Sequence, residues 1–161
     1  MNDRPSQHVP VDTAARPDPR RCVFAAYPVV SSISARYADM DANAHVNNIA
    51  LESMHENARA ELVARVFPGA YDPAQPIRLV ASQNVVHFLA EARWPTVLRT
   101  GVGVARIGRT SFVASSALFD DANCVSVCNT VLVQVDETGP VPLRGNSLET
   151  LRSVLVGWGS V

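Results

Sequence analysis

The sequence predicts an α+β fold in which one long helix packs against an antiparallel sheet of five strands. Apolar residues recur at helical spacing between residues 47 and 67, and from residue 77 to 135 their period changes to two. The short stretches "IGRT" and "DDAN" separate the later strands as turns, which indicates antiparallel hairpins. A sheet of this kind curls around the helix and buries its apolar stripe.

The first predicted elements are a strand and the long helix. Residues 23–37, "VFAAYPVVSSISARY", are rich in β-forming side chains, and Pro28 suits an edge or a bulge of that strand. The helix ends where Pro68 and Gly69 stop it. Its predicted apolar stripe consists of Leu51, Met54, Ala58, Leu62 and Val66.

Four strands and a short helix complete the predicted domain. The strands are expected at 77–89, 96–107, 110–120 and 123–135. Gly101 and Gly103, inside the second of them, indicate a bulge or a close approach of backbone, and core packing explains them equally well. A short C-terminal helix is expected over 146–155, with Asn146 or Ser147 as its cap.

Composition and charge are typical of a single soluble domain. The chain has 161 residues, a formal net charge of −1 and 47% hydrophobic residues, which gives no basic surface for nucleic acid. The polar, proline-rich residues 1–21 are expected to form a mobile tail ahead of one domain at 22–161, and they lack the apolar centre of a signal peptide. No apolar run approaches the roughly 20 residues needed to span a membrane. We therefore expect a cytoplasmic protein.

Several catalytic mechanisms are excluded by the residue types present. All 14 basic residues are arginine, which excludes a Schiff base, pyridoxal phosphate and the phosphate-binding loop that needs lysine. The sequence has no GxSxG elbow, no HExxH motif and no paired CxxC. We expect no metal ion and no resident cofactor, and Cys124 and Cys128 are predicted to be small core residues.

One polar run stands out against the apolar chain: "RYADMDANAHVNN", residues 36–48, directly before the long helix. The first N–H groups of a helix lack internal partners, and the partial positive charge at that end favours an ionised Asp41. Such a carboxylate serves as a base or a nucleophile. The alternative is that these residues are turn formers and caps that start the helix, a role we favour for Asp39.

This run, followed by "ESMHENAR", resembles the signature of the hotdog-fold thioesterases of the 4-hydroxybenzoyl-CoA thioesterase family. Members of that family read roughly Asp-Ala-x-Gly-His-Val-Asn-Asn before the central helix, and the likeness continues through "ARIGRTSF" and "TVLVQVD" to about residue 143. The resemblance implies a hotdog fold and hydrolysis of an acyl thioester, with coenzyme A or an acyl carrier protein as part of the substrate. It also implies that Asp41 is the catalytic carboxylate and that the backbone N–H of Asn48 polarises the carbonyl.

Three further residues near the run are candidates for the catalytic site. His45 is expected to orient the loop through a backbone hydrogen bond or to line the thioester pocket. Asn47 is expected to cap the helix or to bond Asp41. Glu56 belongs either to a solvated charged face of the helix or to the wall of the pocket.

The substrate-binding candidates lie later in the chain. The resemblance implies that the residues after the glycine of "RIGR" approach the pantetheine or nucleotide end of coenzyme A, and arginine forks suit its phosphates. A solvated surface is the alternative for each arginine, and His87 is either a core or interface histidine or a residue that contacts substrate. The candidates are Arg106, Gly108, Arg109, Thr110, Ser111 and His87.

Departures from the family pattern limit what the resemblance implies. Ala44 stands where the family commonly has glycine, and an alanine is strained there if the position requires a positive φ. Leu51, Met54 and His55 replace aromatic residues that often follow the Asn-Asn pair, which indicates a recontoured pocket and favours an aliphatic acyl chain.

The expected assembly is a homodimer or homotetramer, because an open sheet edge is commonly covered by a second copy. Two other functions stay open. A hotdog-fold enoyl-CoA hydratase or dehydratase uses an aspartate and a histidine around "DxNPxxH", but in "DANAH" the histidine comes one residue early and the proline is missing. A non-catalytic acyl-CoA binding module is the second alternative.

Overall fold

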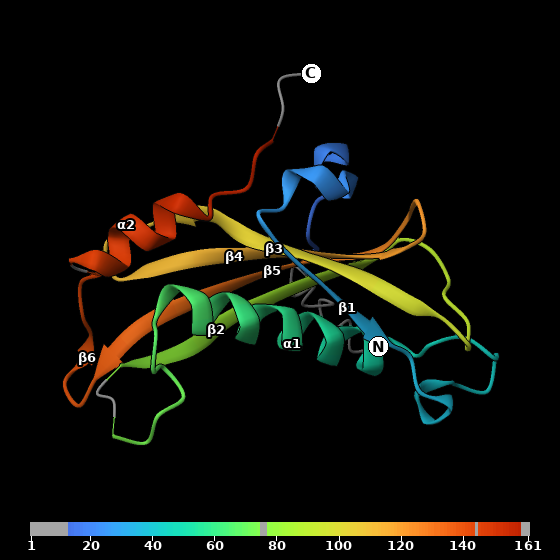
Figure 1. Cartoon of the computed structure of the whole chain (residues 1–161), viewed down its shortest axis with the longest axis horizontal. Coiled ribbons are helices and arrows are strands. Elements are labelled where there is room, and N and C mark those ends of the chain that lie inside the picture. The colour runs from blue at the N-terminus through green and yellow to red at the C-terminus, as the bar shows by residue number, and fades with distance from the viewer. Residues whose placement is uncertain (1–12, 75–76, 144, 159–161) are drawn as a thin grey trace, which may run out of the picture.

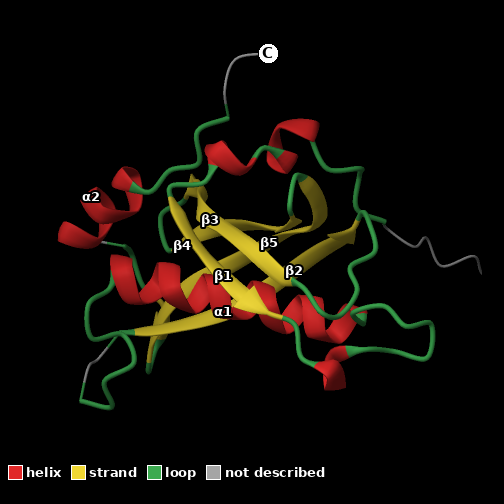
Figure 2. Ribbon diagram, turned by 45° about the vertical axis from the view of Figure 1, so that its right-hand side comes forward, coloured by secondary structure: helices red, strands yellow, loops and turns green. Residues whose placement is uncertain are grey.

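A computed structural model describes residues 13–74, 77–143 and 145–158, and it confirms the predicted fold class. The long helix α1, Asn48–Val66, lies in the concave face of a curled antiparallel sheet (Figure 1, Figure 2). The strands are β1 (Val29–Ser34), β2 (Arg78–Phe88), β3 (Val97–Ile107), β4 (Ser111–Asp120), β5 (Asn123–Asp136) and the two-residue β6 (Gly139–Pro140). The short helix α2, Asn146–Ser153, follows the sheet.

The order of the strands in the sheet is β1-β3-β4-β5-β2, so the strands that flank α1 in sequence lie at opposite edges. Each of the links between β3 and β4 and between β4 and β5 is a hairpin, as the turn sequences predicted. The edge strand β2 is eleven residues long and the other edge strand, β1, is six. The long open edge of this chain is therefore β2.

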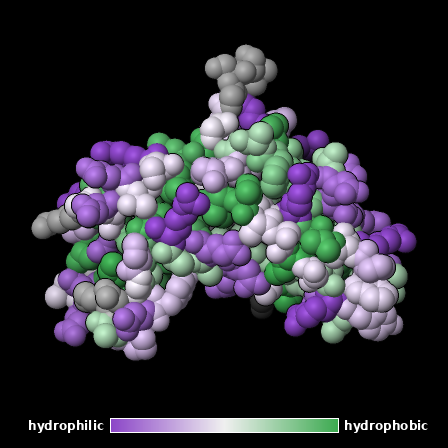
Figure 3. Space-filling view, in the orientation of Figure 1, coloured by the Kyte–Doolittle hydropathy of each residue, from purple (hydrophilic) through white to green (hydrophobic). Residues whose placement is uncertain are grey.

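The predicted apolar stripe of α1 is buried in full, and it packs in two clusters. Leu51 and Met54, near the helix start, pack with Leu98 and Leu118 of the sheet. The later residues of the stripe, including Leu62, belong to the second cluster at the other end of the sheet. Each such side chain contributes roughly 1.5–3 kcal/mol when fully buried. Polar side chains cover the outward side of the helix (Figure 3).

The outer, convex face of the sheet is covered by the two ends of the described chain. Two 3₁₀ turns, η1 (Pro19–Cys22) and η2 (Phe24–Ala26), and the segment 155–158 pack over it. Gly101 lies so close to Tyr27 that an added Cβ would come within 2.8 Å of the Tyr27 ring, and Gly103 is equally close to Pro28. Because the atoms that approach these glycines belong to side chains, the structure shows core packing at Gly101 and Gly103 and not a close approach of backbone.

Two local predictions differ from the structure, and a third is not tested by it. Residues 23–28 form the 3₁₀ turn η2 and its flanks, and β1 begins only at Val29, after Pro28, which has no N–H to donate to a ladder. The cap predicted for α2 is wrong: Gly145, at φ 62°, precedes the helix without a side-chain cap, and Asn146 is already helical. Most of the predicted tail, residues 1–12, lies outside the described residues, while Arg21 is buried against the sheet, and the domain boundary stays a prediction.

His55 lies in the core beneath the sheet and not in a pocket wall. Its Nδ1 is 2.8 Å from Ser116 Oγ and its Nε2 is 3.0 Å from Ser126 Oγ. Ser126 Oγ donates its proton to the His87 carbonyl, so Nε2 of His55 is the protonated nitrogen and Nδ1 accepts from Ser116. Burial, followed by the charges of nearby arginines, lowers the pKa of His55 to about 3.

We expect His55 to make the fold sensitive to mild acid. The pKa falls from 6.5 to about 3 on folding, so between these values the unfolded chain binds the proton and the folded chain does not. The contribution of His55 to stability is therefore full above pH 6.5, and between pH 6.5 and about 3 it falls by about 1.4 kcal/mol per pH unit. Urea unfolding at pH 7.5 and pH 5 measures the loss, and His55→Gln should reduce it. An equal loss in the variant would contradict the assignment.

Candidate active site

The polar run forms a tight turn between β1 and α1. The N–H of Asp41 donates to the carbonyl of His45 at 2.8 Å, and the N–H of Ala44 donates to the carbonyl of Asp41 at 3.1 Å. Met40 and Val46 pair as an isolated antiparallel bridge at the base of the turn. The chain reverses at Ala44, whose φ is 60°, so the position where the family commonly has glycine is left-handed here.

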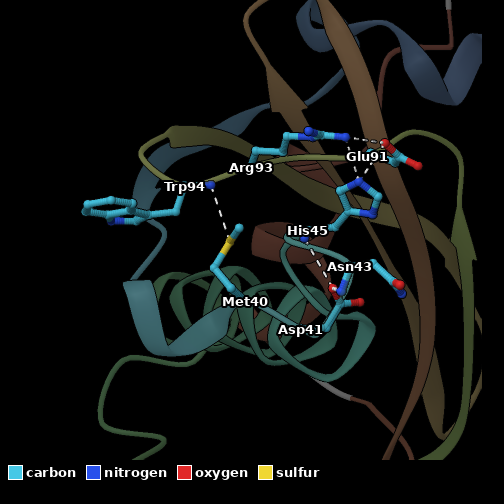
Figure 4. Close-up of polar contacts among 7 residues, drawn as sticks. All are labelled: Met40, Asp41, Asn43, His45, Glu91, Arg93 and Trp94. Atoms are coloured by element: carbon cyan, nitrogen blue, oxygen red, sulfur yellow. Dashed lines mark hydrogen bonds and ion pairs between the residues drawn. The ribbon is translucent and has the colours of Figure 1, made fainter.

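The Asp41 carboxylate is held by the backbone of its own turn (Figure 4). Its Oδ1 accepts the N–H of Asn43 at 2.8 Å and that of His45 at 3.2 Å. The hydrogen bond from His45, followed by that from Asn43, holds the pKa of the exposed Asp41 below its ordinary value. The predicted ionised state is thus supported, although by N–H groups of the turn and not by the helix end. Within the described residues, Oδ2 has no hydrogen-bond partner.

The start of α1 leaves unused N–H groups beside this turn. Asn47 is the N-cap residue, and its Oδ1 accepts the N–H of Ala50 at 2.8 Å, so its side chain caps the helix and does not bond Asp41. The N–H groups of Asn48 and Ile49 come before the first N–H that bonds along the helix, that of Leu51, and have no partner in the part of the chain that the structure describes. They are donors available to a bound oxygen.

A cavity of about 270 Å³ joins these groups. Asp41, His45 and Asn48 line it on one side, and Leu51 lies beneath. The opposite wall is the end of β2 and the residues after it, where Phe88 and Leu89 supply apolar surface. An ionised carboxylate, the residue that carries the first unused N–H group of α1 and apolar walls therefore line one cavity.

The ring of His45 points to the link between β2 and β3 (Figure 4). Its Nε2 lies 2.9 Å from Glu91 Oε2 and 2.9 Å from Arg93 Nη2. When Nε2 carries a proton it donates to Glu91, and when it does not it accepts from Arg93. His45 thus orients the Asp41 turn through its backbone and anchors the turn through its ring.

Glu91 was not singled out in the sequence, because a contact across 46 residues has no local signature. Arg93 precedes Trp94 and Pro95 in the link between β2 and β3, and this local sequence does not indicate a contact with His45. Asp39 has the structural role we favoured for it: it is buried, its Oδ1 accepts Arg36 Nη2 at 2.7 Å and its Oδ2 accepts the Arg36 backbone N–H at 2.7 Å. The hydrogen bonds from Arg36 lower its pKa.

Glu56 does not reach the Asp41 cavity within one chain. It follows Asn48 by eight residues, which is about 12 Å along a helix. Its carboxylate is exposed, pairs with Arg59 Nη2 at 3.0 Å and lines a separate groove of about 450 Å³ between α1 and the beginning of β2. Tyr71 lies on the same groove.

The predicted substrate-binding residues also lie away from Asp41. Gly108, Arg109, Thr110 and Ser111 form the β3–β4 turn, at the end of the sheet opposite the helix start (Figure 1). Arg106 and His87 line a groove on the outer face of the sheet. The structure thus brings together Asp41, His45, Asn47 and Asn48, and leaves the remaining candidates in three other places.

Within residues 13–74, 77–143 and 145–158, no cluster of histidine, cysteine and acidic side chains could hold a metal ion. In the same part of the chain, no helix is both long and apolar enough to cross a membrane.

A long helix in a curled antiparallel sheet, with a carboxylate turn ahead of the helix, defines the hotdog class of folds. The family model of the thioesterase-like superfamily matches residues 35–151, which is more than half of the chain. The protein therefore belongs to the thioesterase-like superfamily. No curated protein matches the sequence.

Solved structures share the fold at low sequence identity. A Pseudomonas aeruginosa protein is 22% identical with a TM-score of 0.74, covering 83% of this chain and 95% of its own. A Thermus thermophilus thioesterase complexed with coenzyme A and zinc is 24% identical with a TM-score of 0.72, covering 80% and 94%. A DHNA-CoA thioesterase of Staphylococcus aureus is 20% identical with a TM-score of 0.62, covering 71% and 78%. At these identities the likeness is one of fold.

We expect Ala44→Gly to stabilise the turn. A left-handed conformation costs a residue with a Cβ roughly 1–2 kcal/mol, and the greater flexibility of unfolded glycine offsets part of the gain. The free energy of unfolding should rise by about 0.5–1 kcal/mol in urea denaturation. Ala42→Gly, the same change at a position without a positive φ, is the matched control and should lower it. Equal effects of the two changes would contradict a strained Ala44.

Proposed function

We propose that the protein hydrolyses an acyl thioester to a free acid and a thiol, with Asp41 as general base or nucleophile. The observation that carries this proposal is the cavity lined by both Asp41 and Asn48, the residue whose unused N–H group begins α1. Thioester hydrolysis requires both parts: a group that delivers the nucleophile and donors where negative charge develops on the carbonyl oxygen.

The reaction follows one of two routes. In the first, Asp41 takes a proton from water while the water oxygen attacks the carbonyl carbon. In the second, Asp41 attacks that carbon directly and water then hydrolyses the mixed anhydride. In both routes negative charge develops on the carbonyl oxygen, where the N–H groups of Asn48 and Ile49 stabilise it. The C–S bond breaks and the thiolate leaves as the thiol after it gains a proton.

The substrate class follows from the superfamily and from the cavity wall. Two proteins of the same fold are described as thioesterases, one complexed with coenzyme A and one acting on DHNA-CoA. We propose an acyl-CoA or acyl-carrier-protein thioester for this chain, with no resident cofactor. The apolar side chains Leu51, Phe88 and Leu89 suit an aliphatic acyl group.

The orientation of His45 favours hydrolysis over hydration of an enoyl thioester. A hydratase of the related hotdog group needs an aspartate and a histidine that both reach the substrate. Here the imidazole Nε2 is engaged by Glu91 and Arg93 at 2.9 Å each.

We also propose that two copies pair through β2. Its edge is open over eleven residues and carries exposed apolar side chains, among them Val80 and Phe88. A two-fold axis across an antiparallel edge sets the beginning of β2 in one copy beside its end in the other. The Asp41 cavity of one copy would then lie near the groove that carries Glu56 and Tyr71 in its partner, so residues separated in one chain would meet across the dimer.

The first test of the activity is thiol release from a panel of acyl-CoA esters by wild type and Asp41→Asn. Loss of a base or nucleophile should lower kcat by about 100-fold or more while the substrate still binds. Glu137→Gln, an exposed carboxylate in the turn after β5, is the control and should retain full activity.

Each result has a defined meaning. If wild type releases nothing from coenzyme A esters, carrier-protein thioesters are tested next, and failure there favours a binding module. Activity that survives Asp41→Asn unchanged would remove Asp41 from the mechanism. Disappearance of an enoyl chromophore without thiol release would indicate the hydratase.

Light scattering after size exclusion tests the assembly. We expect at least twice the chain mass for wild type, since both a dimer and a tetramer built from two such dimers would contain the β2 pairing. Val80→Glu should shift it toward the monomer because pairing through β2 would bury an introduced carboxylate that has no partner charge. Val30→Glu places the same charge on the other edge strand, at a similarly exposed valine, and should leave the mass unchanged. A monomeric wild type, or equal effects of both variants, would contradict pairing through β2.

A further inference from the structure

A second cavity lies on the convex face of the sheet, on the side opposite α1, and we call it the outer-face groove. Its volume is about 460 Å³. Side chains that point outward from four neighbouring strands form its floor, and residues 14–18 and Arg21 form its wall. The apolar part of the floor consists of Val85, Ala105, Val113 and Val131.

The charges around the outer-face groove are predominantly positive. Arg16, Arg21 and Arg106 line it together with His87. Its one described carboxylate, Asp18, is already bound to another arginine, because Arg20 Nε donates to Asp18 Oδ1 at 3.0 Å and Arg20 Nη2 to Oδ2 at 2.5 Å. The groove therefore holds an excess of cationic groups over an apolar floor.

The hydrogen bonding of the Arg21 guanidinium is incomplete among the described residues. Arg21 is 8% exposed, and its guanidinium donates from Nη2 to Asn129 Oδ1, an uncharged acceptor, at 2.9 Å. Among the described residues its buried Nε has no hydrogen-bond partner, and none of their carboxylates forms an ion pair with it. Burying a guanidinium without a counter-charge costs desolvation free energy. A carboxylate or phosphate, whose oxygens accept two parallel N–H bonds, is the group that a guanidinium binds best.

We propose that the outer-face groove binds a small organic anion, whose carboxylate or phosphate pairs with Arg21 and Arg106 while a short apolar body lies on the valines of the floor. The groove and the Asp41 cavity lie on opposite faces of the sheet, so an anion here is not the acyl thioester in the active site. Arg21 and residues 14–18, which form the wall of the groove, precede the region that matches the superfamily, residues 35–151, whereas the floor and Arg106 lie within it.

Calorimetric titration of the full chain tests the site with three probes of one length: hexyl phosphate, hexanoate and 1-hexanol. We expect one anion per chain and no measurable binding of the alcohol. The tighter of the two anions identifies the head group. Affinity should fall as salt concentration rises, because the contact is an ion pair.

Variants separate this site from the other features of the chain. Arg21→Gln should lower the affinity for the anion by about tenfold or more, as loss of a charged hydrogen bond does. The double variant Arg106→Gln with His87→Gln, at two less buried positions, supplies a second test should Arg21→Gln fail to fold. Arg65→Gln, an exposed arginine at the end of α1, is the matched control and should bind as wild type does. Asp41→Asn should also bind normally, which distinguishes failure of this site from failure of the proposed hydrolysis. No anion binding by wild type, equal binding of hexanol, or loss of binding in Asp41→Asn alone would overturn the proposal.

Discussion

The burial of one helical stripe in the concave face of the sheet is the constraint on which the rest of the molecule depends. Leu51 and Met54 can pack against Leu98 and Leu118 only if α1 begins beside the end of β2. The same packing fixes the turn before the helix, where the N–H of Val46 donates to the carbonyl of Ala92 at 2.8 Å. The position of Asp41 is therefore a consequence of how the apolar core is filled.

The electrostatics of the candidate site depend on backbone more than on neighbouring charges. The Asp41 carboxylate takes its hydrogen bonds from N–H groups of its own turn, and the donors proposed for the substrate are N–H groups of α1. Such dipoles are fixed by the fold and need no side-chain rearrangement during a reaction. The side chains of Glu91 and Arg93 do not contact Asp41 and act on it indirectly, because they hold the ring of His45, whose backbone bonds the Asp41 turn.

The sequence predicted those features that arise from local periodicity, and it missed those that arise from distant contacts. The stripe of α1, the two hairpins and the polar turn follow from the spacing of residues close together in the chain, and the structure has them. The 3₁₀ turn at Phe24–Ala26 was predicted as strand because its residues favour strands, whereas packing of Tyr27 on Gly101 decides its path. The contact of His45 with Glu91 joins segments far apart in the chain, and no local sequence pattern predicts it.

The convex face of the sheet is covered by the two ends of the described chain, so the shortest fragment that folds as the whole domain does must include both ends. Residues 35–151 suffice to assign the superfamily, yet they leave out both the 3₁₀ turns at Pro19–Ala26 and the segment 155–158. Without those segments, Ala117, Phe119 and Val127 would form an open apolar sheet surface in water. A protein trimmed to the boundaries of its family would therefore be expected to self-associate through the wrong face.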